Sequence, residues 1–290
     1  MTIISRFAPS PTGYLHIGHA FSALSAWAAA KQAGGRFLLR IEDIDRGRCR
    51  PEFVDAIYQD LCWLGLRWEE PARIQSEHYA DYQRALDQLE EMGLLYRCYH
   101  SRKELKEALS APHLTPMQGP DGPVITDTDL LMDDTERARR EEAGEAYALR
   151  LRMGRALELI HARGEELVWQ DQLHGTQRAT PEIFGDVVLA RKDNPTSYHL
   201  SVVVDDALQG VSLITRGEDL FQATHVHRLL QALLELPVPT YNHHRLLLDE
   251  QGKRLAKRDK AETLQALRAD GVTGAELIER LGFELGDILG

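Results

Sequence analysis

Near its N-terminus the chain has two strand-length apolar runs separated by a proline-containing loop and a long helical pattern. The runs are 2–7 (TIISRF) and 36–41 (RFLLRI), and between them 16–33 (HIGHAFSALSAWAAAKQA) is Ala-rich and closed by Gly34 and Gly35. Short apolar runs are typical of buried strands, and glycine after a periodic run marks a helix end. The order strand, loop, helix, strand predicts a parallel sheet covered by helices, as in nucleotide-binding half-domains.

The same alternation continues over the first third of the chain and is then interrupted. Helical patterns follow at about 51–65 and 76–93. From about 96 to 176 the sequence becomes rich in Pro, Gly and polar residues, as in SAPHLTPMQGPDGPVITD, and carries the charged run DDTERARREEAGE. This change of composition predicts an insertion within the sheet-forming domain.

Strand patterns return after the insertion. The runs 185–189 (GDVVL) and 211–216 (VSLITR) predict further strands of the sheet, and 218–235 predicts an amphipathic helix. The segment SYHLSVVVDDAL is compatible with either a strand or a helix. After two prolines, a strand, a turn and a basic loop are expected to precede two short helices within 261–282.

Composition limits the class of protein. The chain has 290 residues, 43% of them hydrophobic and 27% charged, with a formal net charge of −11, so we expect a globular core and no surface that binds nucleic acid indiscriminately. No apolar run reaches the roughly 18 residues of a membrane span, and a signal peptide is not evident. These two observations predict a cytoplasmic location, and the three scattered cysteines predict reduced thiols. A monomer is the default expectation.

The segment PSPTGYLHIGHA carries the first candidate site. His16 and His19 fall at the start of the predicted helix, where free N–H groups and positive potential suit phosphate oxygens. Gly18 allows a flat base to approach the backbone closely. Taken alone, two histidines at a helix start are more often capping or surface residues.

The basic segment GKRLAKRDK at 252–260 is the second candidate site. Its cations can neutralise the charge that develops on a pyrophosphate leaving group if the loop closes over it, and Lys257 is the residue expected in that role. Such a segment can also form part of an RNA-binding face, although charge alone is more typical of a solvated loop.

Five segments in this order resemble the catalytic half of class I glutamyl-tRNA synthetases and of their shortened paralogues, the glutamyl-queuosine tRNA(Asp) synthetases. The segments span nearly the whole chain and are RFAPSPTGYLHIGH, RFLLRIEDIDRGR, NPTSYHLSVVVDD, LITRGEDL and GKRLAKRD. Five ordered segments are far more specific than any one of them.

The resemblance gives the predicted fold its parts. The expected fold is α/β: the Rossmann-type parallel-sheet catalytic domain of class I aminoacyl-tRNA synthetases, with an inserted α+β subdomain and a short C-terminal helical piece. The first half of the nucleotide-binding domain would occupy 1–95 and its second half 177–239. An acceptor-binding-like insertion would occupy 96–176, and the basic-loop region with a truncated helical C-terminus 240–290.

The resemblance also implies a glutamate pocket beside an ATP site. The residues of the glutamate pocket would be Arg6, Ala8, Ser10, Glu42, Tyr198 and Arg216. The residues of the ATP site would be His16, Gly18, His19, Arg254 and Lys257, of which His16, His19 and Lys257 are the expected catalytic residues. Two arginines suit the two carboxylates of glutamate, with Arg6 the expected partner of the side chain, and Glu42 suits its ammonium group. Taken alone, these residues are more often structural: Arg6 and Glu42 as an ordinary ion pair, Tyr198 as a core aromatic and Arg216 as a surface residue.

The implied reaction uses ATP, with Mg²⁺ held mainly by the phosphates. The α-carboxylate of L-glutamate attacks the α-phosphorus in line, pyrophosphate leaves, and the glutamyl-adenylate passes its glutamyl group to a hydroxyl acceptor. In the shortened paralogues the acceptor is queuosine at the wobble position of tRNA(Asp). The expected partners are therefore L-glutamate, ATP and queuosine-bearing tRNA(Asp).

Three departures from the family pattern bear on these expectations. In the basic segment, Arg254 replaces a lysine and Ala256 a serine, which keeps the charge and loses a hydroxyl. The insertion keeps Cys98 and His100 as the remnant of a zinc-binding pattern, but no later cysteine follows, so zinc is expected to be absent. The residues after Arg258 are too few for an anticodon-binding helical domain like that of the full-length enzymes.

Three other interpretations stay open. A minimal glutamyl-tRNA synthetase would charge the 3′ end of tRNA(Glu), and the missing C-terminal domain speaks against it. A catalytically inactive paralogue would only bind glutamate, nucleotide or RNA, and the retained His16, His19 and Lys257 speak against it. A pantothenate synthetase-like ligase would share the histidine motif, but not the pocket charges that suit glutamate.

Overall fold

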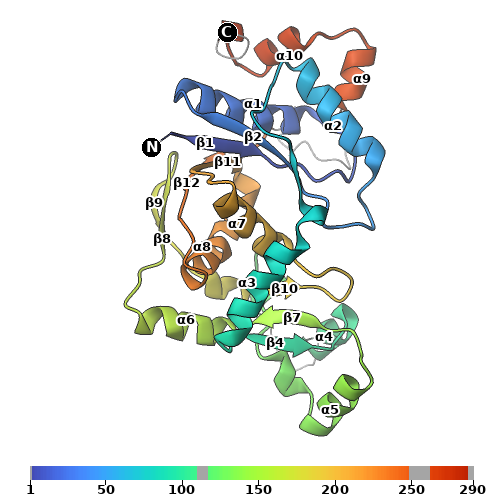
Figure 1. The fold of residues 1–290 in the computed structure, drawn as a ribbon, viewed down its shortest axis with the longest axis vertical. Helices are drawn as coiled ribbons and strands as arrows, with labels where there is room; N and C mark the ends of the chain where they lie inside the picture. Colours follow the sequence, from blue (N-terminus) through green and yellow to red (C-terminus); the bar gives the residue numbers. More distant parts are fainter. Residues whose placement is uncertain (1, 110–116, 248–261, 287–290) are drawn as a thin grey trace.

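A large, mostly parallel sheet forms the centre of the protein. The computed structural model describes residues 2–109, 117–247 and 262–286, and the strands in these ranges form a seven-stranded sheet, a three-stranded sheet and a two-stranded hairpin. The spatial order of the large sheet is β3 (Arg73–Ile74), β2 (Arg36–Ile41), β1 (Ile4–Phe7), β11 (Leu213–Gly217), β12 (Thr240–His244), β8 (Val168–Asp171) and β9 (Gly175–Arg178). Neighbouring strands are parallel except β8 and β9 (Figure 1). The predicted parallel α/β sheet is confirmed, including the predicted strands that became β1, β2 and β11.

The helix α1 (Ile17–Gln32) covers one face of this sheet and packs on β1, β2 and β11. Its buried side is largely alanine, so that the helix backbone can approach the strands closely. The turn into β2 requires glycine: Gly34 has a φ of 60°, and a Cβ on Gly35 would stand 2.1 Å from the carbonyl oxygen of Ile3. The predicted helix and its glycine stop are therefore confirmed.

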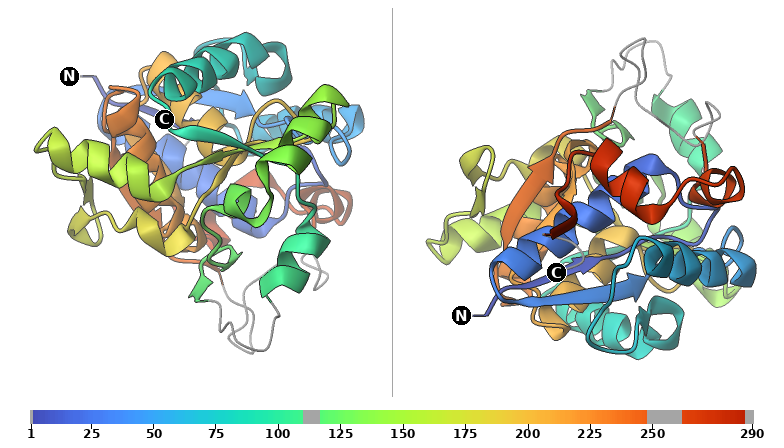
Figure 2. Two further views of the ribbon diagram at one scale, coloured as in Figure 1. Left: turned by 90° about the horizontal axis from the view of Figure 1, so that it is seen from below. Right: turned by 90° about the horizontal axis from the view of Figure 1, so that it is seen from above.

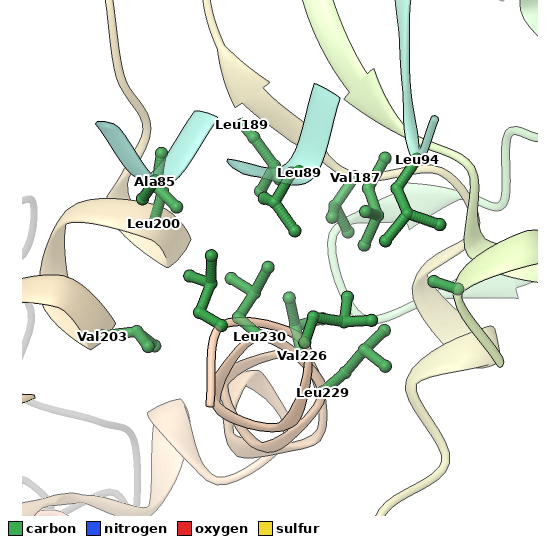
Figure 3. Close-up of a cluster of buried hydrophobic side chains, with 14 of the residues drawn as sticks. Ala85, Leu89, Leu94, Val187, Leu189, Leu200, Val203, Val226, Leu229 and Leu230 are labelled. Carbon is green, nitrogen blue, oxygen red and sulfur yellow. The ribbon is translucent and has the colours of Figure 1, made fainter. Parts of the chain in front are cut away.

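Three helices form the layer on the other face: α3 (Tyr79–Glu91), α7 (Tyr198–Leu208) and α8 (Ala223–Leu233). Their apolar side chains meet in the largest hydrophobic cluster of the described residues, part of which Figure 3 shows. Labelled members are Ala85 and Leu89 of α3, Leu200 and Val203 of α7, and Val226, Leu229 and Leu230 of α8.

The segment whose sequence allowed either a strand or a helix is α7. Its three consecutive valines favour a strand, but helical geometry turns Asp205 and Asp206 toward different partners. Asp205 accepts hydrogen bonds from Gln75 and Tyr82, whereas Asp206 binds Arg6 of β1. Tertiary packing and these two sets of hydrogen bonds outweigh the β propensity of the valines.

The insertion builds the smaller sheet at the end of the molecule away from α1 (Figure 1). This antiparallel sheet contains β10 (Val188–Ala190), β7 (Ala148–Leu151) and β4 (Leu95–Cys98). The other elements of this region are α4 (Arg102–Leu109), the hairpin of β5 (Gln118–Gly119) and β6 (Gly122–Pro123), α5 (Asp134–Glu142) and α6 (Met153–Ala162). Their arrangement fits the α+β character predicted for the insertion.

Sheet membership differs from the sequence-based expectation in two places. The run 185–189 was expected to resume the large sheet, but β10 pairs with β7 of the small sheet, so this expectation is wrong. Conversely β8, which lies within 96–176, and β9, which crosses the end of that range, belong to the large sheet. A short apolar run indicates that a strand is buried but does not show which strand it pairs with. The chain passes from the small sheet to β8 and β9 of the large sheet and then back to β10 of the small sheet.

The C-terminal helices α9 (Leu264–Ala269) and α10 (Gly274–Arg280) confirm the two short helices predicted there. They pack beside α2 (Pro51–Trp63), as the view from above in Figure 2 shows. The contact is close, because a Cβ on Gly274 would stand 2.2 Å from the carbonyl oxygen of Trp63. In the ranges that the structure describes, no helix is both long and apolar enough to cross a bilayer.

Candidate active site

A cavity of about 290 Å³ opens where the parallel strands β1, β11 and β12 end. In open parallel sheets, ligands bind at the carboxyl ends of the strands. The residues predicted for the glutamate pocket all line this cavity, namely Arg6, Ala8, Ser10, Glu42, Tyr198 and Arg216. So do His16, Gly18 and His19 of the predicted ATP site. Arg254 and Lys257, the remaining predicted residues, lie outside the described ranges.

Strand alternation divides the cavity into two halves. Successive side chains of a strand point to opposite faces of the sheet. Arg6 of β1 reaches Asp206 of α7, and Arg216 of β11 lies against α8 on that same face. His244 of β12 instead reaches Ser22 of α1, with 2.9 Å between His244 Nε2 and Ser22 Oγ. The α7–α8 half therefore holds both arginines, and the α1 half faces the start of a helix.

Arg6 is bound to a carboxylate of the protein. Its Nε and Nη2 donate to Asp206 Oδ1 and Oδ2 at 3.0 and 3.2 Å, a bidentate arrangement. Arg40 Nη1 donates to the same carboxylate at 2.8 Å. Burial alone opposes the ionisation of Asp206, but Arg40 and Arg6 outweigh it and lower the pKa of this carboxyl. On this wall of the cavity, the charges of Arg6 and Arg40 are therefore paired with a carboxylate of the protein itself.

Glu42 follows β2 and lies at the edge of that network. Its Oε1 accepts from Arg40 Nη2 at 3.2 Å. Burial raises the pKa of Glu42, and the neighbouring Arg40 and Arg6 offset only part of this effect. A cationic group brought by a ligand would favour the ionised carboxylate, so Glu42 suits an ammonium group.

Arg216 is as deeply buried as Arg6, with exposed fractions of 5% and 4%. Its hydrogen bonds run to uncharged groups. Nε donates to His243 Nε2 at 3.1 Å and Nη2 donates to Thr224 Oγ1 at 2.7 Å. Nη1 donates to Tyr198 Oη at 3.3 Å and lies at the same distance from His227 Nδ1. Among the residues that the structure describes, no carboxylate takes part in holding this second wall together.

The imidazoles beside Arg216 are neutral. Burial and the guanidinium lower the pKa of His243 to about 4 and that of His227 well below its ordinary value. Within residues 2–109, 117–247 and 262–286, no carboxylate oxygen lies within 4.0 Å of the Arg216 guanidinium. A buried cation without a local counter-charge is costly, and an incoming anion relieves that cost. Arg216 therefore suits a ligand carboxylate.

The α1 half begins with the two histidines of the sequence motif. His16 is the N-cap of α1: its Nδ1 accepts from Gly18 N–H at 3.1 Å, and His19 Nδ1 accepts from His16 N–H at 3.1 Å. A neutral imidazole that accepts at Nδ1 carries its hydrogen on Nε2, the form that donates to a phosphate oxygen. Thr215 lines this half from β11, and its buried hydroxyl has no hydrogen-bond partner among the described residues. The α1 half therefore suits a polar, anionic ligand.

Comparison with known proteins identifies the family of this site. Residues 2–285 match the family of class I tRNA synthetases (E and Q), catalytic domain. The chain belongs to this family. A glutamyl-Q tRNA(Asp) synthetase from Rhodobacter capsulatus is 48% identical over 97% of this chain and 100% of the relative. Another of that name, from Symbiobacterium thermophilum, is 42% identical over 97% of this chain and 86% of the relative. The resemblance predicted from five sequence segments is confirmed.

A solved member of the family agrees with the observed fold. The crystal structure of a glutamate tRNA ligase from Elizabethkingia meningosepticum superposes with a TM-score of 0.78 at 24% identity. The alignment covers 97% of this chain and 60% of the ligase. The described structure therefore has the class I synthetase catalytic fold. The family match and the curated relatives show that the chain is a ligase of that class.

The zinc remnant that the family resemblance suggested lies in the small sheet. Cys98 of β4 is buried, and its Sγ accepts from Thr128 Oγ1 at 3.3 Å. His100 Nε2 is buried and has no hydrogen-bond partner among the described residues. Over those same residues, no group of three or more His, Cys, Asp or Glu side chains could hold a metal ion. The absence of zinc stays a prediction, which elemental analysis of the purified protein would check.

The sequence did not reveal the residues that hold the two arginines of this synthetase site. They are Asp206 behind Arg6, and Thr224, His227 and His243 around Arg216. The available signal was weak: a polar residue directly after or within an apolar run, such as the aspartates after three valines in VVVDD. Such a residue is often buried with a partner, but the partner is not readable from the run.

Proposed function

We propose that this chain activates L-glutamate with ATP as glutamyl-adenylate and transfers the glutamyl group to queuosine at the wobble position of tRNA(Asp). The similarity to glutamyl-Q tRNA(Asp) synthetases over nearly the whole chain supports the complete reaction. The observation that carries glutamate activation is the burial of Arg216 among neutral hydrogen-bonding partners, with no carboxylate of a described residue within 4.0 Å of its guanidinium. Glu42 lines the same cavity, which continues to the start of α1.

Glutamate would bind in the α7–α8 half of the cavity. Its ammonium group would contact Glu42, and a carboxylate would contact Arg216, with Tyr198 as a wall and hydroxyl donor. The sequence led us to expect Arg6 as the partner of the side-chain carboxylate. Because Asp206 already engages Nε and Nη2 of Arg6, we assign the stronger carboxylate contact to Arg216. Arg6 then contributes mainly positive potential and the shape of the loop that carries Ala8 and Ser10.

ATP would bind in the α1 half. His16 and His19 would donate to phosphate oxygens, Gly18 would leave room for the base, and the Thr215 hydroxyl would gain its missing partner. Arg254 and Lys257 keep the role proposed from the sequence, neutralising the departing pyrophosphate. Mg²⁺ would arrive with ATP, coordinated by phosphate oxygens.

The proposed chemistry relies on positioning rather than on a covalent enzyme intermediate. Arg216 and Glu42 would fix glutamate so that its α-carboxylate meets the α-phosphorus in line, and pyrophosphate would leave toward the basic segment. A hydroxyl of queuosine would then attack the glutamyl carbonyl carbon, forming an ester while AMP leaves. We further propose that the protein acts as a monomer in the cytoplasm, where tRNA and ATP are available.

The test is transfer of labelled glutamate, with ATP and Mg²⁺, to tRNA(Asp) with or without queuosine and to tRNA(Glu). Label on queuosine-bearing tRNA(Asp) alone is the expected result. Label on the 3′ end of tRNA(Glu) would identify a minimal glutamyl-tRNA synthetase instead. If glutamate-dependent pyrophosphate exchange is absent as well, the chain is a binding protein and the proposed activation is wrong.

The Lys257→Ala variant tests the proposed role of the basic segment in stabilising the pyrophosphate leaving group. Loss of the leaving-group contact should depress adenylate formation with an unchanged fold. The exchange rate and the circular dichroism spectrum of both proteins check this, and an unchanged exchange rate would remove Lys257 from the proposed machinery.

A further inference from the structure

Arg216 stands one imidazole ring away from a buried carboxylate. Asp171, at the end of β8, lies on the far side of His243, with 2.6 Å between Asp171 Oδ2 and His243 Nδ1. Both side chains have an exposed fraction of 0%. The order along this line is Arg216, His243, Asp171, and it joins three neighbouring strands of the large sheet.

The hydrogen bonds along this line have a defined direction. Asp171 can only accept when ionised, so His243 Nδ1 carries a hydrogen and donates it. The neutral ring then presents a lone pair at Nε2, and Arg216 Nε donates to it at 3.1 Å. The other neutral tautomer would place two donors face to face. The Asp171 carboxylate therefore fixes the tautomer that accepts from Arg216.

Asp171 itself is held firmly as an anion. Its Oδ1 accepts from the backbone N–H groups of Leu173 and His174 at 2.9 and 3.0 Å. Burial alone would raise the pKa of Asp171, but the hydrogen bonds from His243 and from these two N–H groups lower it. A charged carboxylate is thus fixed close to Arg216 without touching it.

The contrast with Arg6 shows what the intervening ring changes. Arg6 contacts Asp206 directly and bidentately, and that contact occupies the Nε–Nη2 edge of its guanidinium. Arg216 instead contacts four neutral side chains, those of His243, Tyr198, His227 and Thr224, so among the described residues its charge is not cancelled at contact distance.

We propose that His243, oriented by Asp171, is a positioning residue for glutamate recognition: it holds Arg216 through a neutral acceptor and keeps the Asp171 carboxylate one ring away from the guanidinium. The inference rests on the proposed function and deepens it. It accounts for a buried histidine and a buried aspartate that the reaction itself does not use.

The decisive comparison is between His243→Gln and His243→Glu. Glutamine keeps a neutral acceptor near Arg216, whereas glutamate brings a carboxylate into direct contact with it, as Asp206 is with Arg6. The KM for glutamate should rise by no more than about threefold in His243→Gln and by about 30-fold or more in His243→Glu. The KM for ATP, measured in the same pyrophosphate exchange assay, should stay within about twofold in both.

A second variant tests the tautomer. Asp171→Asn keeps an oxygen for the two backbone N–H groups but removes the charge that selects the Nδ1–H form of His243. We expect the KM for glutamate to rise about three- to tenfold with an unchanged KM for ATP. In the unaltered protein, two-bond ¹H–¹⁵N spectra should show His243 as the Nδ1–H tautomer at neutral pH, whether or not the variants fold.

The outcomes separate this inference from the proposed function. Glutamate-dependent exchange in the unaltered protein, together with equal glutamate KM values for the two His243 variants, would overturn the positioning role alone. So would an Nε2–H tautomer or an imidazolium at His243. Absence of exchange in the unaltered protein would instead overturn the proposed function, whatever the tautomer.

Discussion

The two arginines of the cavity are equally buried but are held in opposite ways. Arg6 lies in a carboxylate network with Asp206, Arg40 and Glu42, whereas Arg216 lies among a hydroxyl, a phenol and two neutral imidazoles. The first arrangement satisfies the charge within the protein. The second leaves the charge to be satisfied by a ligand.

The difference separates stability from binding. A buried ion pair is destabilising when one partner is removed, because the other charge stays behind uncompensated. A buried cation surrounded by neutral acceptors already carries that penalty in the free protein, and a bound carboxylate relieves it. Loss of the Asp206 carboxylate that holds Arg6 should therefore mainly affect folding, and changes around Arg216 should mainly affect glutamate binding.

The largest effect is expected from Asp206→Asn. This change leaves Arg6 and Arg40 buried without their shared carboxylate, and the free energy of unfolding should fall by about 3–5 kcal/mol. Urea denaturation at neutral pH measures it. The matched control is Asp45→Asn, which breaks the exposed pair with Arg48 and should cost no more than about 1 kcal/mol. Equal losses in the two variants would contradict the network described for Arg6.

Arg216→Met should have the converse effect. Methionine fills much of the same volume without charge, so the KM for glutamate should rise about 100-fold. The KM for ATP should not change, and the free energy of unfolding should stay the same or increase, since a buried unpaired charge has been removed. Pyrophosphate exchange kinetics measure the two KM values, and urea denaturation of the same preparation measures the free energy of unfolding. A loss of stability as large as that of Asp206→Asn would erase the distinction between the two arginines.

Glu42 should set the acidic limit of glutamate binding. Only the ionised carboxylate binds an ammonium group, so affinity is full above the pKa of Glu42 and is lost as the pH falls through it. Because burial raises that pKa, the loss should begin at a higher pH than for an ordinary glutamate. Glu42→Gln should raise the KM for glutamate about tenfold at neutral pH and abolish this acidic limb. A limb that persists in Glu42→Gln would belong to another group.

The smallest effect is expected from Thr224→Val. The change removes one neutral acceptor of Arg216, at 2.7 Å from Nη2, and should raise the KM for glutamate about three- to fivefold. Thr224→Ser keeps the hydroxyl and should behave like the unaltered protein. If the two variants have the same KM, the Thr224 hydroxyl does not help to hold Arg216.

Local signals in the sequence were sufficient for most of the fold. The apolar runs that became β1 and β2, the Ala-rich α1 and its glycine stop are properties of a few consecutive residues. Pairing over long distances was not readable in the same way. The strand β10 was expected in the large sheet and lies in the small one, and β8 joins the large sheet from within the insertion. Which strand a run pairs with depends on the rest of the chain.

In the candidate site, too, residues in local motifs could be predicted from the sequence, and contacts between distant segments could not. Residues within the matched segments, such as Arg6, Glu42 and Arg216, could be named from the sequence, and they line one cavity. Asp171 and His243 could not, because they meet only when β8 and β12 lie side by side. The sequence also could not show that the Asp206 carboxylate accepts both hydrogen bonds from Arg6, because this contact depends on α7 being a helix.

The pairing of β1 with β11 has a consequence for how the chain is made. Ile4 N–H donates to Ser212 Oγ, which lies 208 positions later in the sequence. The strand β11 pairs with β1, the strand that carries Arg6. At a synthesis rate of about 5–20 residues per second, β1 would wait roughly 10–40 s on the ribosome before its neighbour emerges. During that interval the edge of β1 that later pairs with β11 has no partner strand, so an apolar strand edge stays exposed on the nascent chain.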